Sequence, residues 1–98
     1  MSEITVAEVD VRRVRDQIVD VREDAEVAEG MIPGAIHIPL GQLASRSGEL
    51  DRERSVVTVC RSGKRSARAA EELSQLGFQA DTMGGGMIAW QSAGLPTS

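Results

Sequence analysis

The sequence predicts an α/β domain with a central, mostly parallel β-sheet flanked by helices. Short runs rich in β-branched residues alternate with helix-forming stretches, and Gly or Pro often stands between them. Strands separated by helical segments favour a parallel sheet. The 98 residues, 41% apolar and 27% charged, fit a single globular domain spanning 1–98.

The N-terminal third begins with a short strand at Ile4. Thr5 and Glu8 have the spacing of a capping box, which predicts a brief helix over 6–13. The stretch 17–21, with three β-branched residues, is typical of a buried strand.

The next segment predicts a helix, a turn and a strand. Helix-forming residues fill 23–29, and Gly30 can end that helix in a left-handed conformation. Pro and Gly at 33–34 mark a turn, a short strand follows at 36–38, and one helical turn is expected at 40–44.

The second half contains the clearest pattern. The polar stretch 45–55 is expected to be a loop, and 55–59 is the clearest strand. A helix is predicted over 65–76, because Ala69, Leu73 and Leu76 share one face.

Glycines mark the boundaries of the predicted elements in the C-terminal segment. Gly77 ends the predicted 65–76 helix, and a strand is expected at 78–83. Three glycines at 84–86 then lead into a last helix at 87–93. Gly94 and Pro96 end that helix.

The composition argues against several functions. A net charge of −4, with no Tyr, one Phe and one Trp, does not favour nucleic-acid partners. No apolar run approaches the ~20 residues that span a bilayer, so no membrane partner is expected. The acidic N-terminus lacks a secretory pattern, and the single cysteine cannot form an intramolecular disulfide. A reducing, cytoplasmic location is therefore expected.

That cysteine, Cys60, follows the clearest strand directly. Parallel sheets bind ligands beyond the carboxyl ends of their strands. The loop after Cys60 leads into a helix, whose first N–H groups are unpaired and carry partial positive charge. Gly63 permits a tight loop that turns further N–H groups inward. The sequence thus predicts a ring of donors around a sulfur.

Such donors have a chemical consequence. Helix N-termini and cations lower the pKa of a thiol from about 8.5 to ~3.5–7.5, which gives a nucleophilic thiolate. The same donors can hold an anionic substrate. Arg61, Lys64 and Arg65 would attract a small dianion, whereas Arg68 is expected on the solvated face of the helix.

A structural role for the cysteine is the alternative, because a lone cysteine is most often a small buried hydrophobe. The position at a strand end, Gly63 and the absence of carboxylates from the loop favour a reactive thiol.

Other catalytic motifs fit poorly. A phosphate-binding P-loop would need glycine in place of Thr58 and Ser or Thr in place of Arg65. One Cys and one His cannot make a metal site. The single histidine, His37, lies in a short predicted strand and is expected to be structural rather than the base of a cysteine protease.

Three stretches together resemble the single-domain rhodaneses, the thiosulfate sulfurtransferase-like family. They are "IVDVREDAEVAEGMIPGAIHIPL" at 18–40, "VVTVCRSGKRSARAAEELSQLGF" at 56–78 and "GGGMIAWQSAGLP" at 84–96. The resemblance covers most of the chain, in the order and spacing of the family. It implies the rhodanese-like three-layer fold.

The resemblance also implies a sulfurtransferase without metal or organic cofactor. Cys60 would accept a sulfane sulfur from thiosulfate or a related small anionic donor and pass it to cyanide, a thiol or a protein. The backbone of the loop would bind the donor and the persulfide. The residues that this assigns to substrate binding are Arg61, Ser62, Gly63, Lys64, Arg65 and Ser66.

Two polar residues, Asp20 and Arg22, match the Asp-x-Arg of the family. They follow a predicted strand, and we expect a structural ion pair that supports the catalytic loop. One position departs from the family, because Met31 stands where a histidine usually precedes Ile-Pro-Gly-Ala.

Two alternatives remain at this point. Related phosphatases and arsenate reductases have five residues between Cys and Arg, whereas four separate Cys60 from Arg65, and a smaller loop suits a single sulfur. A persulfide relay or sulfur-carrier module with little thiosulfate turnover is also compatible with the sequence.

Overall fold

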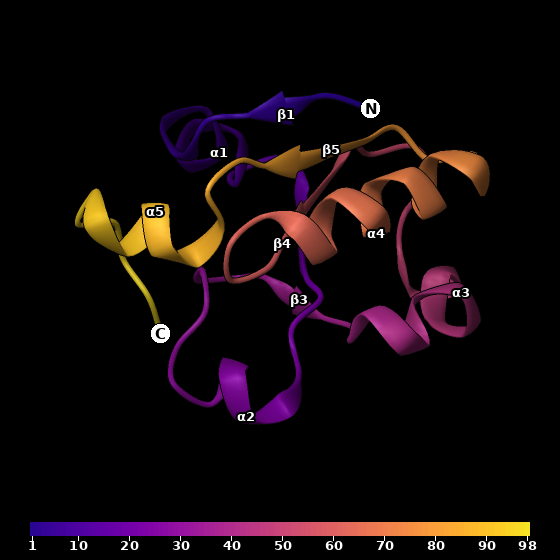
Figure 1. Cartoon of the computed structure of the whole chain (residues 1–98). Helices are drawn as coiled ribbons and strands as arrows, with labels where there is room; N and C mark the ends of the chain where they lie inside the picture. The colour runs from indigo at the N-terminus through magenta and orange to yellow at the C-terminus, as the bar shows by residue number, and fades with distance from the viewer.

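The computed structural model describes residues 1–98 and confirms the predicted α/β fold. Its five strands form one sheet in the order β1-β5-β4-β2-β3, and every pair is parallel (Figure 1). The strands are β1 (Glu3–Ile4), β2 (Gln17–Asp20), β3 (Ile36–His37), β4 (Val56–Val59) and β5 (Ala80–Met83).

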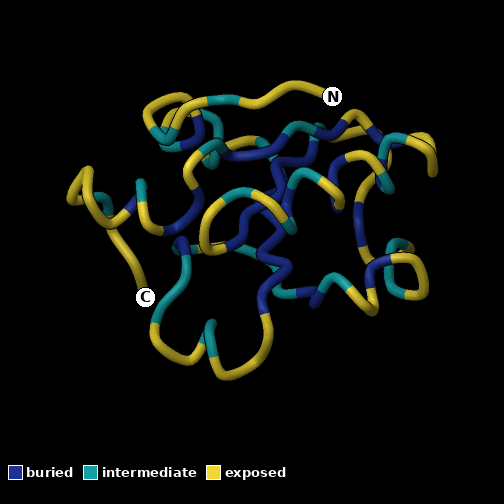
Figure 2. Tube along the Cα trace, in the orientation of Figure 1, coloured by how far each residue is buried: buried dark blue, intermediate teal, exposed yellow.

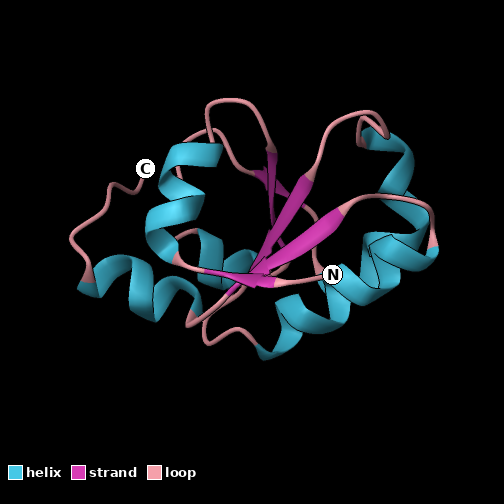
Figure 3. Cartoon of the chain, turned by 90° about the horizontal axis from the view of Figure 1, so that it is seen from above, coloured by secondary structure: helices cyan, strands magenta, loops and turns pink.

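Helices lie on both sides of the sheet, which gives three layers (Figure 3). They are α1 (Val6–Arg12), α2 (Asp24–Val27), α3 (Leu43–Arg46), α4 (Lys64–Gln75) and α5 (Gly86–Ser92), with 3-10 turns η1 (Leu40–Gln42) and η2 (Ser47–Glu49). None of these helices has the length and apolar character needed to cross a bilayer.

Two apolar cores separate these layers, and the buried strands run between them (Figure 2). On one face, α3 and α4 pack on the sheet through side chains that include Leu43, Ala69 and Leu73. On the other, α1 and α5 contribute Val9 and Trp90. Strands that are buried on both faces are rich in apolar residues, and in β4 three of the four buried residues are valine.

Most predicted elements are present with shifted ends. Thr5 caps α1, because its hydroxyl accepts a hydrogen bond from the Glu8 N–H at 3.2 Å. The prediction that 45–55 is wholly a loop was wrong, since the end of α3 and η2 lie within it. Leu76 was also misplaced: it follows the last turn of α4 and is 36% exposed.

The register of the sheet brings two loops to the same edge. Asp20 at the end of β2 pairs with Val59 at the end of β4, and the Val21 N–H donates to the Val59 carbonyl at 2.9 Å. Cys60, one residue after β4, and Arg22, two residues after β2, therefore lie at the same edge of the sheet. This edge is the carboxyl end of the sheet, where parallel α/β folds bind ligands.

The first turn of helix α5 donates hydrogen bonds to the backbone of Cys60 and Arg61, which follow β4. The Met87 N–H donates to the Cys60 carbonyl at 2.8 Å, and the Ile88 N–H donates to the Arg61 carbonyl at 3.1 Å. This contact needs glycine at position 86, where φ is +59° and a Cβ would collide with backbone atoms of Cys60 and Arg61. The third glycine of 84–86 thus lets the start of α5 approach the loop.

We expect Gly86→Ala to lower the free energy of unfolding by about 2–4 kcal/mol. Alanine is strained in the left-handed conformation of this residue, and its Cβ would collide with the backbone of Cys60 and Arg61. Chemical denaturation measures this change. Gly48→Ala is the control, because Gly48 has an ordinary φ and no neighbouring atom lies within 4 Å of the position that a Cβ would occupy. Equal stability of the two variants would contradict the packing of α5 against the loop.

Candidate functional site

The sulfur of Cys60 is surrounded by hydrogen-bond donors of its own loop. The Gly63 N–H lies 3.1 Å from Sγ, and the Ser66 N–H lies 3.3 Å from it. The Ser66 hydroxyl is 3.4 Å away. Gly63 is the N-cap of α4 with a φ of +106°, so the glycine permits the turn that directs these groups inward.

Trans peptide geometry extends this arrangement to Ser62. The carbonyl and the N–H of one trans peptide point in opposite directions. Because α5 binds the Arg61 carbonyl, the N–H of the same peptide, which belongs to Ser62, points away from α5. This N–H donates to Cys60 and lowers its pKa. The contacts of α5 thereby orient a third backbone donor.

These donors favour the thiolate. Burial of Cys60 is the largest single influence on its pKa and raises it. The hydroxyl and N–H of Ser66, with the N–H groups of Gly63 and Ser62, together outweigh burial and hold the pKa below the ordinary thiol value. Cys60 is only 1% exposed, so its sulfur is held almost entirely inside this ring of donors.

The other predicted residues of the loop fall into two groups. The side chains of Arg61, Ser62 and Lys64 are exposed, and neither cation forms an ion pair. Ser66 is fully buried beside the sulfur. Arg68 is exposed on α4, as the helical pattern indicated.

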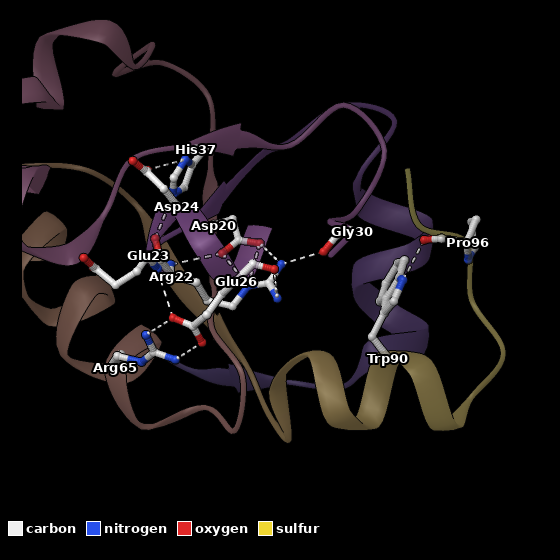
Figure 4. A network of polar contacts seen from close by, with 10 residues as sticks. All are labelled: Asp20, Arg22, Glu23, Asp24, Glu26, Gly30, His37, Arg65, Trp90 and Pro96. Atoms are coloured by element: carbon white, nitrogen blue, oxygen red, sulfur yellow. Dashed lines mark hydrogen bonds and ion pairs between the residues drawn. The ribbon is translucent and has the colours of Figure 1, made fainter. Parts of the chain in front are cut away.

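Arg65 has a partner that the sequence did not indicate. Its guanidinium binds both carboxylate oxygens of Glu26 in α2, at 2.7 and 2.8 Å (Figure 4). The Arg65 hydrogen bonds lower the pKa of Glu26 to about 2. The charge of Arg65 is therefore balanced by Glu26.

Asp20 and Arg22 form a buried ion pair, with Arg22 Nη2 2.8 Å from Asp20 Oδ2. Arg22 also donates to the Gly30 carbonyl at 2.8 Å and to the Glu26 carbonyl at 3.4 Å. The pair thus fixes the α2 segment, which in turn presents Glu26 to Arg65 (Figure 4). The pair is thus connected to the Cys60 loop through Glu26, which binds Arg65.

His37 lies outside this arrangement. Its Nε2 donates to the Arg22 carbonyl at 2.7 Å, and its Nδ1 lies 3.8 Å from a carboxylate oxygen of Asp24. Neither nitrogen contacts Cys60. The donors of the loop, not a histidine base, thus favour ionisation of the thiol.

Three side chains near the loop were missed at the sequence level. Glu26 belongs to a helix 34 residues before Cys60, so its pairing depends on the folded chain. Thr58 and Thr82 are typical strand residues by type. Both threonines lie at buried strand positions, and a buried hydroxyl needs a hydrogen-bond partner. A threonine within a predicted buried strand was therefore the one sign in the sequence that a polar contact lies there.

We expect Glu26→Gln to lower the free energy of unfolding at pH 7. The shift of the Glu26 pKa from 4.5 to about 2 corresponds to about 3 kcal/mol. Solvent screening reduces this to about 1–2 kcal/mol, because the Arg65 and Glu26 side chains are 35% and 29% exposed. Urea denaturation of the variant and the wild type measures the difference.

The pH dependence of that difference identifies the ion pair. A depressed carboxyl pKa stabilises the fold above the unfolded value, and this stabilisation disappears as the pH falls through the folded value. The difference in free energy of unfolding between the wild type and Glu26→Gln should therefore disappear as the pH falls from about 4.5 to about 2. Glu29→Gln, at an exposed residue without an ion pair, is the control and should change little. A gap independent of pH would rule out this pairing.

Comparison with known proteins agrees with the fold. A family model described as a rhodanese-like domain matches residues 5–93. The putative sulfurtransferase YtwF of Bacillus subtilis strain 168 is 44% identical over 79 residues, which cover 81% of this chain and 77% of that protein. The thiosulfate sulfurtransferase GlpE of Shewanella oneidensis is 37% identical over 78 residues, covering 79% and 77%.

A solved structure matches almost completely. The crystal structure of a rhodanese-related protein from Thermoplasma volcanium has a TM-score of 0.95 and 33% identity to this chain. The match covers 100% of this chain and 98% of that one.

Proposed function

Because the chain belongs to the rhodanese-like domain family, we propose that it is a sulfurtransferase acting on thiosulfate or a related sulfane donor through a persulfide on Cys60. The observation that carries this proposal is the convergence of the Gly63 and Ser66 N–H groups on Sγ. A relative named as a thiosulfate sulfurtransferase supports this choice of donor.

The first half of the reaction loads the cysteine. The Cys60 thiolate attacks the outer sulfur of thiosulfate and forms a new S–S bond. The original S–S bond of thiosulfate breaks, and sulfite leaves with its electron pair. The donors of Gly63 and Ser66 stabilise negative charge on sulfur before and after this step.

The second half unloads it. An acceptor, which is cyanide, a thiol or a protein thiol, attacks the outer sulfur of the persulfide. The Cys60–sulfur bond breaks, the acceptor carries the sulfur away, and the thiolate is regenerated. We place this cycle in the cytoplasm, because a reducing compartment keeps a lone thiol free.

Loop size supports sulfur over phosphate as the group transferred. Four residues, 61–64, lie between Cys60 and Arg65, and Arg65 is bound by Glu26. A phosphoryl group would need a wider ring of donors and a free guanidinium. Cys60-dependent hydrolysis of an aryl phosphate would argue against this choice.

Incubation of the protein with thiosulfate should add one sulfur, about 32 Da, to the intact mass. A reductant should remove the added mass, and Cys60→Ser should abolish it. Polysulfide and glutathione persulfide serve as parallel donors. Absence of the adduct with every donor would refute the proposal, whereas loading by persulfides alone would identify a relay module.

Lys64 should affect thiosulfate binding more than catalysis. We expect Lys64→Gln to raise the KM for thiosulfate about threefold at low ionic strength, with kcat little changed and the effect reduced by salt. Steady-state kinetics with cyanide as acceptor measure both constants. Arg68→Gln, which removes a cation one turn further along α4, is the matched control. Identical KM values for the two variants would mean that Lys64 is ordinary surface charge.

A further inference from the structure

A buried pair of hydroxyl groups lies behind the sulfur. Thr82 of β5 and Ser66 of α4 are 2% and 0% exposed. The Thr82 hydroxyl donates to Ser66 Oγ at 2.8 Å, and Ser66 Oγ lies 3.4 Å from Cys60 Sγ. A side chain from a neighbouring strand is thus connected to the nucleophile through one intermediate oxygen.

The direction of these hydrogen bonds follows from the partners available. Ser66 Oγ is the one hydrogen-bond partner of the Thr82 hydroxyl, so Thr82 supplies the proton of that bond. Ser66 directs its own proton to the Gly63 carbonyl, 3.1 Å away. In the neutral thiol, the S–H of Cys60 donates to Ser66 Oγ as well.

Ionisation of the cysteine changes this arrangement. Once Sγ loses its proton it can only accept, and the Ser66 hydroxyl can turn from the Gly63 carbonyl toward the charged sulfur, a stronger acceptor. Ser66 Oγ then no longer accepts a hydrogen bond from the S–H of Cys60, and the Thr82 hydroxyl is its remaining donor. Without Thr82, this fully buried oxygen would have no donor, which carries a free-energy penalty.

We propose that Thr82 is a positioning residue for the nucleophile: its hydroxyl keeps Ser66 Oγ supplied with a donor, so that Cys60 can release its proton. The inference rests on the proposed role of Cys60 as nucleophile. Ser66, whose hydroxyl and N–H face the reacting sulfur, is the catalytic residue through which Thr82 acts.

Thr58 provides a matched control. It is also a fully buried strand threonine, but its hydroxyl donates to the Ser66 backbone carbonyl at 2.7 Å rather than to Oγ. Thr58→Val therefore removes a comparable buried hydroxyl without changing the donors to the Ser66 side chain.

The test is a titration of Cys60 by the ultraviolet absorbance of the thiolate, with Cys60→Ser as blank. The chain has one Cys and no Tyr, so no tyrosine ionisation obscures the signal. Thr82→Val should raise the pKa of Cys60 by about one unit, a tenfold loss of thiolate at a fixed pH below that pKa. Thr82→Ser, which keeps the hydroxyl, should restore the wild-type titration, and Thr58→Val should leave it unchanged.

Two results would overturn the inference: a wild-type titration in Thr82→Val, or an equal shift in Thr58→Val. If Thr82→Val does not fold, Thr82→Ala removes the hydroxyl with less bulk and gives the same readout. The titration needs no sulfur donor, so the two proposals can fail separately. Persulfide formation with coincident titrations would contradict only the role of Thr82, whereas a shifted titration without loading by any donor would contradict only sulfur transfer.

Discussion

The arrangement of this site depends on the N–H groups of Gly63 and Ser66, which point at the sulfur of Cys60. A buried thiol in an apolar core resists ionisation, because burial disfavours charge. Here the donors are supplied by the backbone, at fixed positions set by a left-handed glycine and the first turn of α4. Preorganised donors of this kind stabilise charge without reorganising when it appears.

Contacts on three sides hold the loop in that form. From the sheet, the Thr82 hydroxyl of β5 donates a hydrogen bond to the Ser66 side chain. From α5, two N–H groups bind the carbonyls of Cys60 and Arg61 and so fix the backbone that leads into the loop. From α2, Glu26 holds the Arg65 side chain at the start of α4. Each contact comes from a different element, so the site requires the complete fold.

The pairing of Glu26 with Arg65 separates the cations of the loop into a paired one and unpaired ones. Arg65 is paired with Glu26, whereas Arg61 and Lys64 are exposed and form no ion pair. The acidic protein can therefore present local positive charge to a small anion, while one of its arginines anchors α2 to α4. The Asp20–Arg22 pair adds rigidity to that anchor, because Arg22 binds the backbone at Glu26 and Gly30.

The alternation of strand and helix patterns was enough to predict the parallel α/β sheet, and the family resemblance added the three layers. The β-branched run before Cys60 predicted that this cysteine follows a buried strand, as it does after β4. The end of α3 and η2 were not predicted from the polar sequence around Gly48, because short helices with few apolar side chains lack a clear period. Glu26, 39 residues before Arg65, and Thr82, 16 residues after Ser66, become partners only through the sheet topology. Local patterns carry no information on such pairings.

The most direct measurement of the central claim is an amide NMR titration of Gly63 and Ser66. If these N–H groups hold the charge of Cys60, both amide proton resonances will shift downfield together. Their shared apparent pKa will lie below the ordinary thiol value of about 8.5. The same resonances will not titrate in Cys60→Ser. Amides that remain unchanged while the thiol ionises would show that the donors do not stabilise the sulfur.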